Sequence, residues 1–539
     1  MKAGNGDKGL INRNSRNYCI KRSAAILIVI AAFLSLVSAG GAFVSADSDN
    51  KSADQSGAVP KYKTLKELSG KRIGVQVGSV FDEYAEDKIP DVRIEYFSTF
   101  PDEVNALKAS KLDGIACLES AIIQLQGQAD GIVVLNEPVG VIPLGFVYPK
   151  NEKGRKLADQ MSEFLAKLEE EGELERLKEV WNGNDESAKV VDDYSSFPAD
   201  NGTLTFVTEG TFPPFDYFRD GKIIGYDVDI AVRFCKEYGY GLKIKDMNFD
   251  ALMPAIQSGK FDFAASGIAI TEERAKKVHF SSPDYYQNAV VAVLAEGDSS
   301  GSFIASVRDS FVNTFVREHR YMLFLKGIRT TLDITVLSII FGTLLGFILY
   351  MWCRKGGRAA KLITRFCVWL VHGLPGIVLL MLLYYVVFGK TDISGMWVAI
   401  TGFTMTFAAS VYSMIVSGVN AVDPGQTEAS YALGFTDTQT FFGIILPQAA
   451  KHFMPAYKEE IVTLIKATAV VGYIAVQDLT KMGDIVRSRT YEAFFPLIAI
   501  AVIYFILAGV LKAVVGRLTV NVDPEKRSES KILKGIKVK

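Results

Sequence analysis

Apolar residues are concentrated near the start of the chain and over its last two hundred positions. An apolar run at 24–44 follows a basic leader and ends at Val44-Ser45-Ala46, which is typical of a secretory signal or an uncleaved anchor. From position 332 onward, apolar runs of about 20 residues recur, the length that crosses a bilayer. Core helices of a soluble protein would rarely give several such runs in one stretch. We therefore predict five spans, at Leu332–Trp352, Phe366–Phe388, Met396–Val419, Ile461–Val476 and Phe494–Val515.

The segment from about position 47 to 300 alternates short β-branched runs with amphipathic stretches. Strands are predicted at 71–77, 94–97 and 112–117, and helices at 101–110, 153–181 and 227–238. A polar stretch at 182–203, rich in Gly, Asp and Ser, is typical of a linker. The alternation predicts an α/β fold with mostly parallel sheets, which bind ligands at the carboxyl ends of their strands.

The distribution of Lys and Arg orients the predicted spans. The loop at 353–361 and the C-terminal tail are basic, so the positive-inside rule places both in the cytoplasm. Five spans then place the α/β segment outside, where the signal would also deliver it. One loop disagrees, because 477–492 should lie outside although it carries Lys481, Arg487 and Arg489.

Composition fits a membrane protein and argues against several other classes. Hydrophobic residues make up 49% of the 539 positions, charged residues 22%, and the mean hydropathy is +0.19. Lys and Arg (59) balance Asp and Glu (60), so nucleic-acid binding, which requires a basic domain, is not expected. The cysteines and histidines are scattered, so we expect no metal site. No paired nucleophile and base emerges, so we expect a protein that is not an enzyme.

Motifs of the α/β segment resemble the polar amino-acid solute-binding proteins, two-lobed receptors of the type II periplasmic-binding-protein class. Resemblance to the first lobe rests on Thr208–Phe215, Gly225–Asp229, Phe249–Asp262, Ser266–Arg274 and Phe280–Tyr286. Leu65–Ser79 resembles the start of the second lobe, and Glu173–Gly183 resembles the family's C-terminal end. The family has the first lobe first, whereas here it follows. The resemblance therefore implies one circularly permuted receptor, or else two incomplete halves that another chain completes.

The same resemblance implies a set of ligand contacts. Arg274 stands at the family's carboxylate-binding arginine, and a guanidinium can hold a carboxylate through two parallel hydrogen bonds. Phe212 and Phe249 match the aromatic positions that enclose the substrate, and Glu209 matches an acidic position that faces an ammonium or a cationic side chain. Further contacts would come from Ser266, Gly267, Ala269, Thr271, Gly78, Ser79 and Val80.

Leu118 departs from the family pattern, because relatives hold the α-ammonium group with an aspartate at this position. Either the adjacent Glu119 replaces that aspartate, or ammonium recognition has moved. Ordinary structural roles are also open: Phe212 and Phe249 could be core aromatics, and Arg274 could form a surface salt bridge.

The most specific motif follows the third predicted span. Asp423–Gly434, with Ile444-Ile-Leu-Pro447 after it, resembles the EAA loop of ABC importer permeases. We predict a short helix, a break at Gly434 and a second helix stopped by Pro447. The resemblance implies docking of this loop on an ATPase subunit through Gly425, Glu428, Ala429, Gly434, Leu446 and Pro447.

Together the resemblances cover about residues 62–296 and 322–518 and imply a fused receptor and permease of a polar amino-acid ABC importer. The sequence has no Gly-x-x-x-x-Gly-Lys-Ser/Thr phosphate loop, so we expect no cofactor in this chain and expect ATP and magnesium to bind a partner ATPase. Two permease domains form one pore, which favours a homodimer embedded in membrane lipid. Lys466, inside the fourth predicted span, either lines the pathway or reaches out from a helix end.

The alternative function is an exported amino-acid sensor with a membrane signalling or channel module. A signalling module needs an output domain, yet only about 22 residues follow Arg517. A channel of that kind needs a span inside the α/β segment, where the sequence has none. We therefore expect an importer in the plasma membrane of a bacterium, with its receptor on the extracytoplasmic side.

The expected domain order follows from these boundaries. It is a signal peptide or anchor (1–46), a linker (47–61), the second lobe with the C-terminal helices (62–183), a linker (184–202), the first lobe (203–298), an interfacial segment (299–325), the permease (326–518) and a cytoplasmic tail (519–539).

Overall fold

The computed structural model describes residues 59–126, 131–194, 197–296, 310–391, 393–491 and 494–519. The chain forms two compact units, residues 1–57 with 300–321 and residues 58–299 with 322–539. The predicted signal, the linker up to residue 58, residues 299–309 of the predicted interfacial segment and the tail beyond 519 lie outside the described residues. In the first unit the described part consists of η3 (Val312–Val316) and η4 (Arg317–His319), and the rings of Phe311 and Phe315 are 4.9 Å apart. Everything below concerns the second unit.

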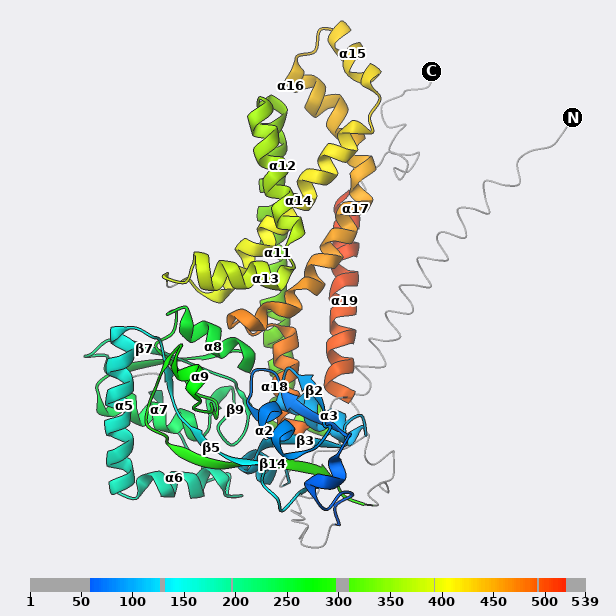
Figure 1. The fold of residues 1–539 in the computed structure, drawn as a ribbon. Helices are drawn as coiled ribbons and strands as arrows, with labels where there is room; N and C mark the ends of the chain where they lie inside the picture. Colours follow the sequence, from blue (N-terminus) through cyan, green and yellow to red (C-terminus); the bar gives the residue numbers. More distant parts are fainter. Residues whose placement is uncertain are drawn as a thin grey trace, which may run out of the picture. The chain divides into compact units, whose positions relative to one another are not determined.

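A sheet of six strands forms one lobe of the α/β domain (Figure 1). Its order is β2-β1-β3-β14-β4, and β5 pairs with β14. The strands are β1 (Arg72–Gln76), β2 (Arg93–Phe97), β3 (Gly114–Leu118), β4 (Ile132–Val134), β5 (Gly140–Leu144) and β14 (Tyr285–Leu294). The helices are η1 (Leu65–Leu68), α2 (Phe81–Lys88), α3 (Phe100–Lys108) and α4 (Glu119–Gln126). We call this the six-stranded lobe; it corresponds to the second lobe of the sequence analysis.

A sheet of order β11-β7-β12-β6-β13 forms the five-stranded lobe, which corresponds to the first lobe. Its strands are β6 (Val147–Tyr148), β7 (Thr203–Thr208), β11 (Gly241–Asp246), β12 (Phe263–Ala264) and β13 (His279–Phe280). A smaller sheet contains β8 (Thr211–Phe212), β9 (Asp216–Arg219) and β10 (Lys222–Ile224). The helices are α5 (Glu152–Glu170), α6 (Glu173–Asn182), α7 (Tyr226–Glu237), α8 (Phe249–Gln257) and α9 (Glu272–Ala275).

The chain crosses between the lobes twice, from β5 to β6 and from β13 to β14. Strands β2-β1-β3 and β11-β7-β12 run parallel, as predicted, but the crossing strands β14 and β6 pair antiparallel with their neighbours. The sheets are therefore mixed rather than mostly parallel, because strands that enter from the other lobe arrive in the opposite direction.

The two ends of the α/β domain lie side by side. Pro60 pairs with Ala295 in an antiparallel bridge. The Lys61 N–H donates to the Leu294 carbonyl at 2.9 Å, and the Glu296 N–H donates to the Val59 carbonyl at 2.7 Å. Residues 59–61 therefore extend the edge at which β14 ends.

The helix predicted over 153–181 is interrupted. Helix α5 ends at Glu170, and α6 begins at Glu173 after Gly172, whose φ of +70° lies in the left-handed region that glycine tolerates. The apolar positions at helical spacing are nevertheless buried as expected, including Leu157, Met161, Phe164, Leu165 and Leu168.

The remaining residues form the helical region. Its helices and helical turns are α11 (Tyr321–Lys355), α12 (Arg358–Gly373), α13 (Gly376–Met381), η5 (Leu382–Val387), α14 (Gly395–Asn420), α15 (Pro424–Ala432), α16 (Asp437–Thr440), η6 (Phe441–Ile445), α17 (Leu446–Ala467), η7 (Thr468–Ile474), α18 (Leu479–Thr490) and α19 (Phe494–Thr519). Among the described residues, α11, α14 and α19 are long and apolar enough to cross a membrane. The pair formed by α12 and 376–387, bent by 109°, could supply a fourth span. Pro375 lies at this bend.

Five spans were predicted, and three or four helices among the described residues are candidates by length and composition. The fourth predicted span, Ile461–Val476, has other bounds in the structure. Helix α17 begins at Leu446 and ends at Ala467, and 3-10 turns follow it to Ile474. This helix carries Lys451, Lys458, Glu459, Glu460 and Lys466, so its composition is not that of a lipid-facing span.

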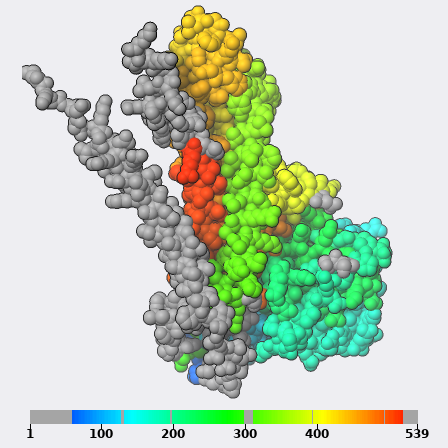
Figure 2. Space-filling model, turned by 180° about the vertical axis from the view of Figure 1, so that it is seen from behind, coloured from blue at the N-terminus to red at the C-terminus, as the bar shows by residue number. Residues whose placement is uncertain are grey.

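The outer faces of α11 and α19 are apolar and little covered. Only 28% of the most apolar window of α11 and 22% of that of α19 is buried. Figure 2 shows both helices at the surface, α11 in green and α19 in red. Exposed side chains include Ile340, Leu344, Ile348, Leu497 and Phe505. Such faces are stable in lipid or against another helix, as the membrane prediction requires.

Candidate functional site

A narrow cavity lies between the two lobes. The six-stranded lobe contributes Gln76, Ser79, Val80, Phe81, Leu118, Ile142 and Leu144, and the five-stranded lobe contributes Phe212, Phe249, Ser266, Gly267, Ala269 and Arg274. Its free volume is about 20 Å³, which has room for little more than one water molecule. The lobes in this arrangement are closed on their own side chains, so they must separate before a ligand larger than water can enter.

Arg274 joins the two lobes across this cavity. It lies in α9, which the Thr271 side chain caps by accepting the Arg274 N–H at 3.2 Å. The guanidinium donates to the Ala269 carbonyl at 2.8 Å and to the Gly78 carbonyl of the other lobe at 2.7 Å. Burial lowers the pKa of Arg274, although a guanidinium stays charged at neutral pH. A fixed cation with donors aimed between the lobes is suited to a carboxylate.

Aromatic rings form the opposite wall. Phe212 stacks on Phe215 with ring centroids 5.5 Å apart, and the edge of Phe100 from the other lobe packs on it at 5.6 Å. Gly267 has a φ of +56°, and a Cβ at this position would lie 3.1 Å from Leu118 and 3.2 Å from Phe212. Its N–H donates to Asp227 at 2.9 Å, which fixes the loop beside the wall.

Most of the predicted ligand contacts line the cavity together. They are Ser79, Val80, Phe212, Phe249, Ser266, Gly267, Ala269 and Arg274. Thr271 lies outside the lining, where it caps α9. Glu119 also lies outside it and accepts a hydrogen bond from Asn288 at 2.8 Å. Leu118 does line the cavity, so an apolar side chain occupies the position at which the family resemblance implied an aspartate.

Glu209 does not line the cavity but contacts Gln76, which does. Gln76 was not among the predicted ligand contacts. The Gln76 amide donates to the Glu209 carboxylate at 2.8 Å. Burial raises the pKa of Glu209 to about 7, against the opposing effect of the Lys481 charge. The signal for Gln76 was present in the sequence, because it is the single uncharged polar residue in the apolar run of β1, just before the Gly78 loop.

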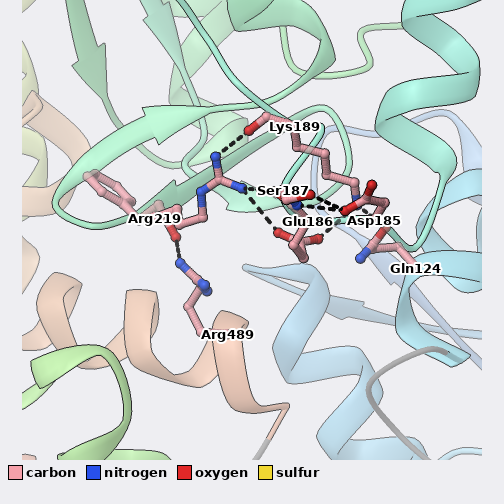
Figure 3. A network of polar contacts seen from close by, with 8 residues as sticks. Gln124, Asp185, Glu186, Ser187, Lys189, Arg219 and Arg489 are labelled. Carbon is pink, nitrogen blue, oxygen red and sulfur yellow. Dashed lines mark hydrogen bonds and ion pairs between the residues drawn. The ribbon is translucent and has the colours of Figure 1, made fainter. Parts of the chain in front are cut away.

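The linker at 184–202 joins α6 to β7, both in the five-stranded lobe, and charged side chains hold it in place (Figure 3). The buried Lys189 ammonium donates to Gln124 of the six-stranded lobe at 3.2 Å and to Glu186 at 2.9 Å. Arg219 of the five-stranded lobe donates to the Glu186 carbonyl at 3.0 Å and to the Lys189 carbonyl. The linker therefore contacts both lobes and is held in place by hydrogen bonds.

The predicted coupling segment forms two short helices joined at a glycine. Asp423 caps α15 by accepting the Gly425 N–H at 2.7 Å, and the side chains and backbones of Thr436 and Gln439 form a capping box for α16. The break falls at Gly434, whose φ is +84°. Of the predicted coupling residues, Gly425, Glu428, Ala429, Gly434 and Pro447 are exposed, and Leu446 is half-buried.

Pro447 does not stop a helix, contrary to the prediction. It lies in the first turn of α17, and η6 leads into that helix without a break. Pro447 thus lies where the wider π turn of η6 passes into α17, and such a change in helical pitch accommodates a residue without a backbone N–H.

The coupling segment also carries large apolar side chains on its surface. Tyr431, Leu433, Phe435 and Phe442 are exposed, and Leu433 is 77% exposed. Arg354, near the end of α11, donates to the Asp437 carboxylate at 2.7 Å and holds the segment in place. A rigid, exposed apolar patch of this kind is typical of a protein interface.

Comparison with known proteins relates about a third of the chain to transport permeases. A putative glutamine transport system permease protein of Rickettsia felis is 32% identical over 193 residues, which are 35% of this chain and 87% of that protein. The arginine transport system permease protein ArtQ of Bacillus subtilis is 34% identical over 206 residues, 36% of this chain and 93% of that protein. The chain belongs to the amino-acid ABC transporter permeases. A crystal structure of an amino acid ABC transporter with histidines is 29% identical and matches 41% of this chain and 98% of that chain, with a TM-score of 0.35.

This permease is joined to a receptor domain. Residues 204–469 match the bacterial extracellular solute-binding proteins, family 3. The match starts at β7, in the five-stranded lobe, and extends into the permease. One polypeptide therefore carries the solute-binding and the permease parts of an amino-acid ABC transporter, and its relatives are transport components rather than ATPases.

Two further predictions concern the permease and metal binding. Lys466 is exposed near the end of α17, which is compatible with both roles foreseen for it. In the part of the chain that the structure describes, no group of three or more His, Cys, Asp or Glu side chains is arranged to hold a metal ion.

Proposed function

We propose that this chain is the receptor and pore subunit of an importer for polar amino acids. The observation that supports this most directly is Arg274, which lies between the two lobes beside an aromatic wall. When the lobes separate, its donors to the Gly78 carbonyl are freed for a ligand carboxylate. Relatives of the permease are named for glutamine and arginine transport, which agrees with a polar substrate.

The ammonium group of the ligand would be recognised through Gln76 and Glu209. Leu118 offers no charge where the family resemblance implied an aspartate, and Glu119 is turned towards Asn288. Gln76 reaches the cavity, and its amide is held by the Glu209 carboxylate. A cation in the cavity would therefore meet an amide oxygen backed by a buried carboxyl group.

The α/β domain would be one circularly permuted receptor. Each sheet contains strands from two separate segments of the chain, and the crossing strands complete both sheets. The pairing of residues 59–61 with 294–296 supports this reading. A circular permutation opens the chain at a single place, so the new first and last residues of the domain should be neighbours. The linker at 184–202 would then replace the original ends.

The energy for transport would come from a separate ATPase, bound at the coupling segment through Gly425, Glu428, Ala429, Gly434, Leu446 and Pro447. The exposed apolar patch around Leu433 supports this role. Two copies of the chain would form the pore in the plasma membrane of a bacterium, with the receptor lobes outside. Closure of the lobes on an amino acid would be followed by ATP-driven switching of the pore.

The test uses the full chain in lipid nanodiscs, with thermal shifts measured for each of the twenty L-amino acids. We expect at least one polar amino acid to raise the Tm by mass action. The Arg274→Ala variant should lose this shift, whereas Arg155→Ala, which removes an exposed arginine of α5, should keep it. The proposal is wrong if no amino acid raises the Tm of the unaltered chain.

A further inference from the structure

Helix α18 of the permease is buried against the α/β domain rather than exposed on a loop. It lies between α17 and α19, and Met482 and Ile485 belong to the same buried apolar cluster as the interiors of both lobes. This is the loop whose basic residues contradicted the charge rule. The structure gives the reason, because its basic side chains contact the α/β domain instead of facing the cytoplasm.

The first of these contacts is made by Lys481 with the five-stranded lobe. Its ammonium lies 3.5 Å from the Asp246 carboxylate and donates to the Asn248 side chain at 3.1 Å. The side chains of Lys481 and Asp246 are 3% and 0% exposed. Burial disfavours the charged form of Lys481, yet Asp246 and Glu209 together raise its pKa above the ordinary value. The lysine is therefore a buried cation that interacts with the carboxyl groups of Asp246, Glu209 and Asp484.

The other end of α18 contacts the six-stranded lobe. Arg487 forms an ion pair with Asp102 of α3 and a second one with Asp484 of its own helix at 2.8 Å. The Tyr491 ring meets the edge of Phe100 at 6.3 Å, and its carbonyl accepts from Lys108 at 3.4 Å. One rigid helix of 12 residues thus binds both lobes. A change in the angle between the lobes must break the contacts at one end.

A short chain of contacts leads from Lys481 to the cavity. Lys481 lies 3.5 Å from Asp246, and the same carboxylate accepts the N–H of Gly210, the residue after Glu209, at 2.9 Å. Glu209 in turn accepts the Gln76 amide, and Gln76 lines the cavity. At this position the Lys481 charge lowers the pKa of Glu209 against the effect of burial. When α18 is docked, the Lys481 ammonium offsets the negative charge of the nearby carboxyl groups. These carboxyl groups would otherwise attract the ammonium group of a ligand in the cavity. Buried charges interact strongly because water does not screen them.

We propose that α18 docks on the closed receptor through both lobes and that Lys481, acting through Glu209, weakens the hold of the receptor on the ammonium group of its ligand. The permease would thereby promote release of the amino acid that it is about to transport. This inference rests on the proposed function, because it requires an ammonium-bearing ligand in the cavity.

The test compares dissociation constants of the full chain in nanodiscs, measured by calorimetry with each of the twenty L-amino acids. Replacing Lys481 by glutamine should tighten binding of the amino acid that binds best by roughly fivefold or more, the lower end of known couplings between sites. Lys481→Arg should keep the unaltered affinity. Lys390→Gln, which removes an exposed lysine from the loop before α14, should also leave it unchanged.

A double-mutant cycle separates this role from a purely structural one. In a Glu209→Gln background, Lys481→Gln should no longer change the affinity, because the carboxyl group through which it acts is gone. Unchanged or weaker binding in the Lys481→Gln single variant overturns the inference but leaves the proposed function intact. If Lys481→Gln does not fold, Arg487→Gln, which loosens α18, is introduced instead into the Glu209→Gln background. Arg487→Gln should not tighten amino-acid binding in that background, and a tightening would contradict the inference. Absence of binding to the unaltered chain overturns both.

Discussion

Buried carboxyl groups make the receptor domain sensitive to pH. Burial raises the pKa of Glu209 to about 7, and that of Asp227, chiefly by burial, also to about 7. The folded domain thus retains protons that the unfolded chain releases above about pH 4.5. Stability from this source is present below that pH and is lost as the pH rises through 7.

We therefore expect the Tm of the full chain to fall between about pH 5 and pH 8. For Glu209 alone, the difference in pKa corresponds to on the order of 3 kcal/mol. Glu209→Gln should flatten the dependence, and Glu95→Gln, at an exposed position of β2, should not. If the Tm of Glu209→Gln falls with pH as steeply as that of the unaltered chain, Glu209 is not the group that causes the pH dependence.

Gly267 gives a second prediction at this scale. Alanine at this position would be strained at a φ of +56° and would press on Leu118 and Phe212. We expect Gly267→Ala to lower the free energy of unfolding by about 1–3 kcal/mol and to weaken ligand binding. Gly259→Ala is the matched control, since Gly259 has a φ of +73° with open space around it. Equal losses of binding in the two variants would argue against a role for the cavity wall.

Single residues show what sequence reasoning can and cannot reach. Arg274 and Phe212 could be placed because their motifs are local and specific. Gln76 and the true position of Glu209 could not, because they depend on how two segments 133 positions apart meet across the lobes. Lys481 was noticed only as an exception, since its partners Asp246 and Asn248 are far away in the sequence.

Among the elements, the coupling segment presents the clearest functional surface. Leu433→Ser should reduce amino-acid uptake by cells that express the chain with its ATPase. The reason is that the variant lacks an exposed apolar side chain with which the coupling segment would contact the ATPase. Its effect on stability should stay within about 0.5 kcal/mol, as for most surface substitutions. Val190→Ser, at another exposed apolar position, serves as the control for uptake. Normal uptake by the Leu433 variant would exclude this side chain from the docking surface.

The linker at 184–202 offers a separate test. Arg219→Ala removes a donor to two linker carbonyls and should destabilise the full chain by about 1 kcal/mol, which thermal or chemical denaturation would detect. Lys222→Ala removes only an exposed ion pair with Asp193 and should cost less. A larger loss for Lys222→Ala would show that the linker is not held through Arg219.

Elements were predicted well where a periodic pattern decided them and poorly where local signals compete. The parallel strands β1, β2 and β3 and the helix α7 lie close to their predicted positions. Pro447 was read as a stop, although the same residue is acceptable where a π turn passes into an α-helix. Helix α17 was misplaced because it begins before the apolar run that was used to predict it and carries charged residues that pair with neighbouring helices, as Glu459 does with Lys512.

At the scale of the whole molecule, all strands of both lobes come from one continuous segment, so the receptor domain should fold without the permease. We expect residues 59–296, produced alone, to fold as a monomer, because both sheets and both crossings lie within this segment. Sedimentation and near-UV circular dichroism would check this. A dimer, or a fragment without fixed tertiary structure, would favour completion by another chain and would refute the permuted receptor.

The meeting of Val59 with Glu296 gives the receptor domain the character of a removable insert. A domain whose ends touch can be excised from a host chain, or placed into another one, without stretching either flank. Joining residue 58 directly to residue 297 would leave a membrane protein shorter by the whole receptor. Gain or loss of the receptor by a permease of this kind would thus require only a single insertion into its gene or a single deletion from it.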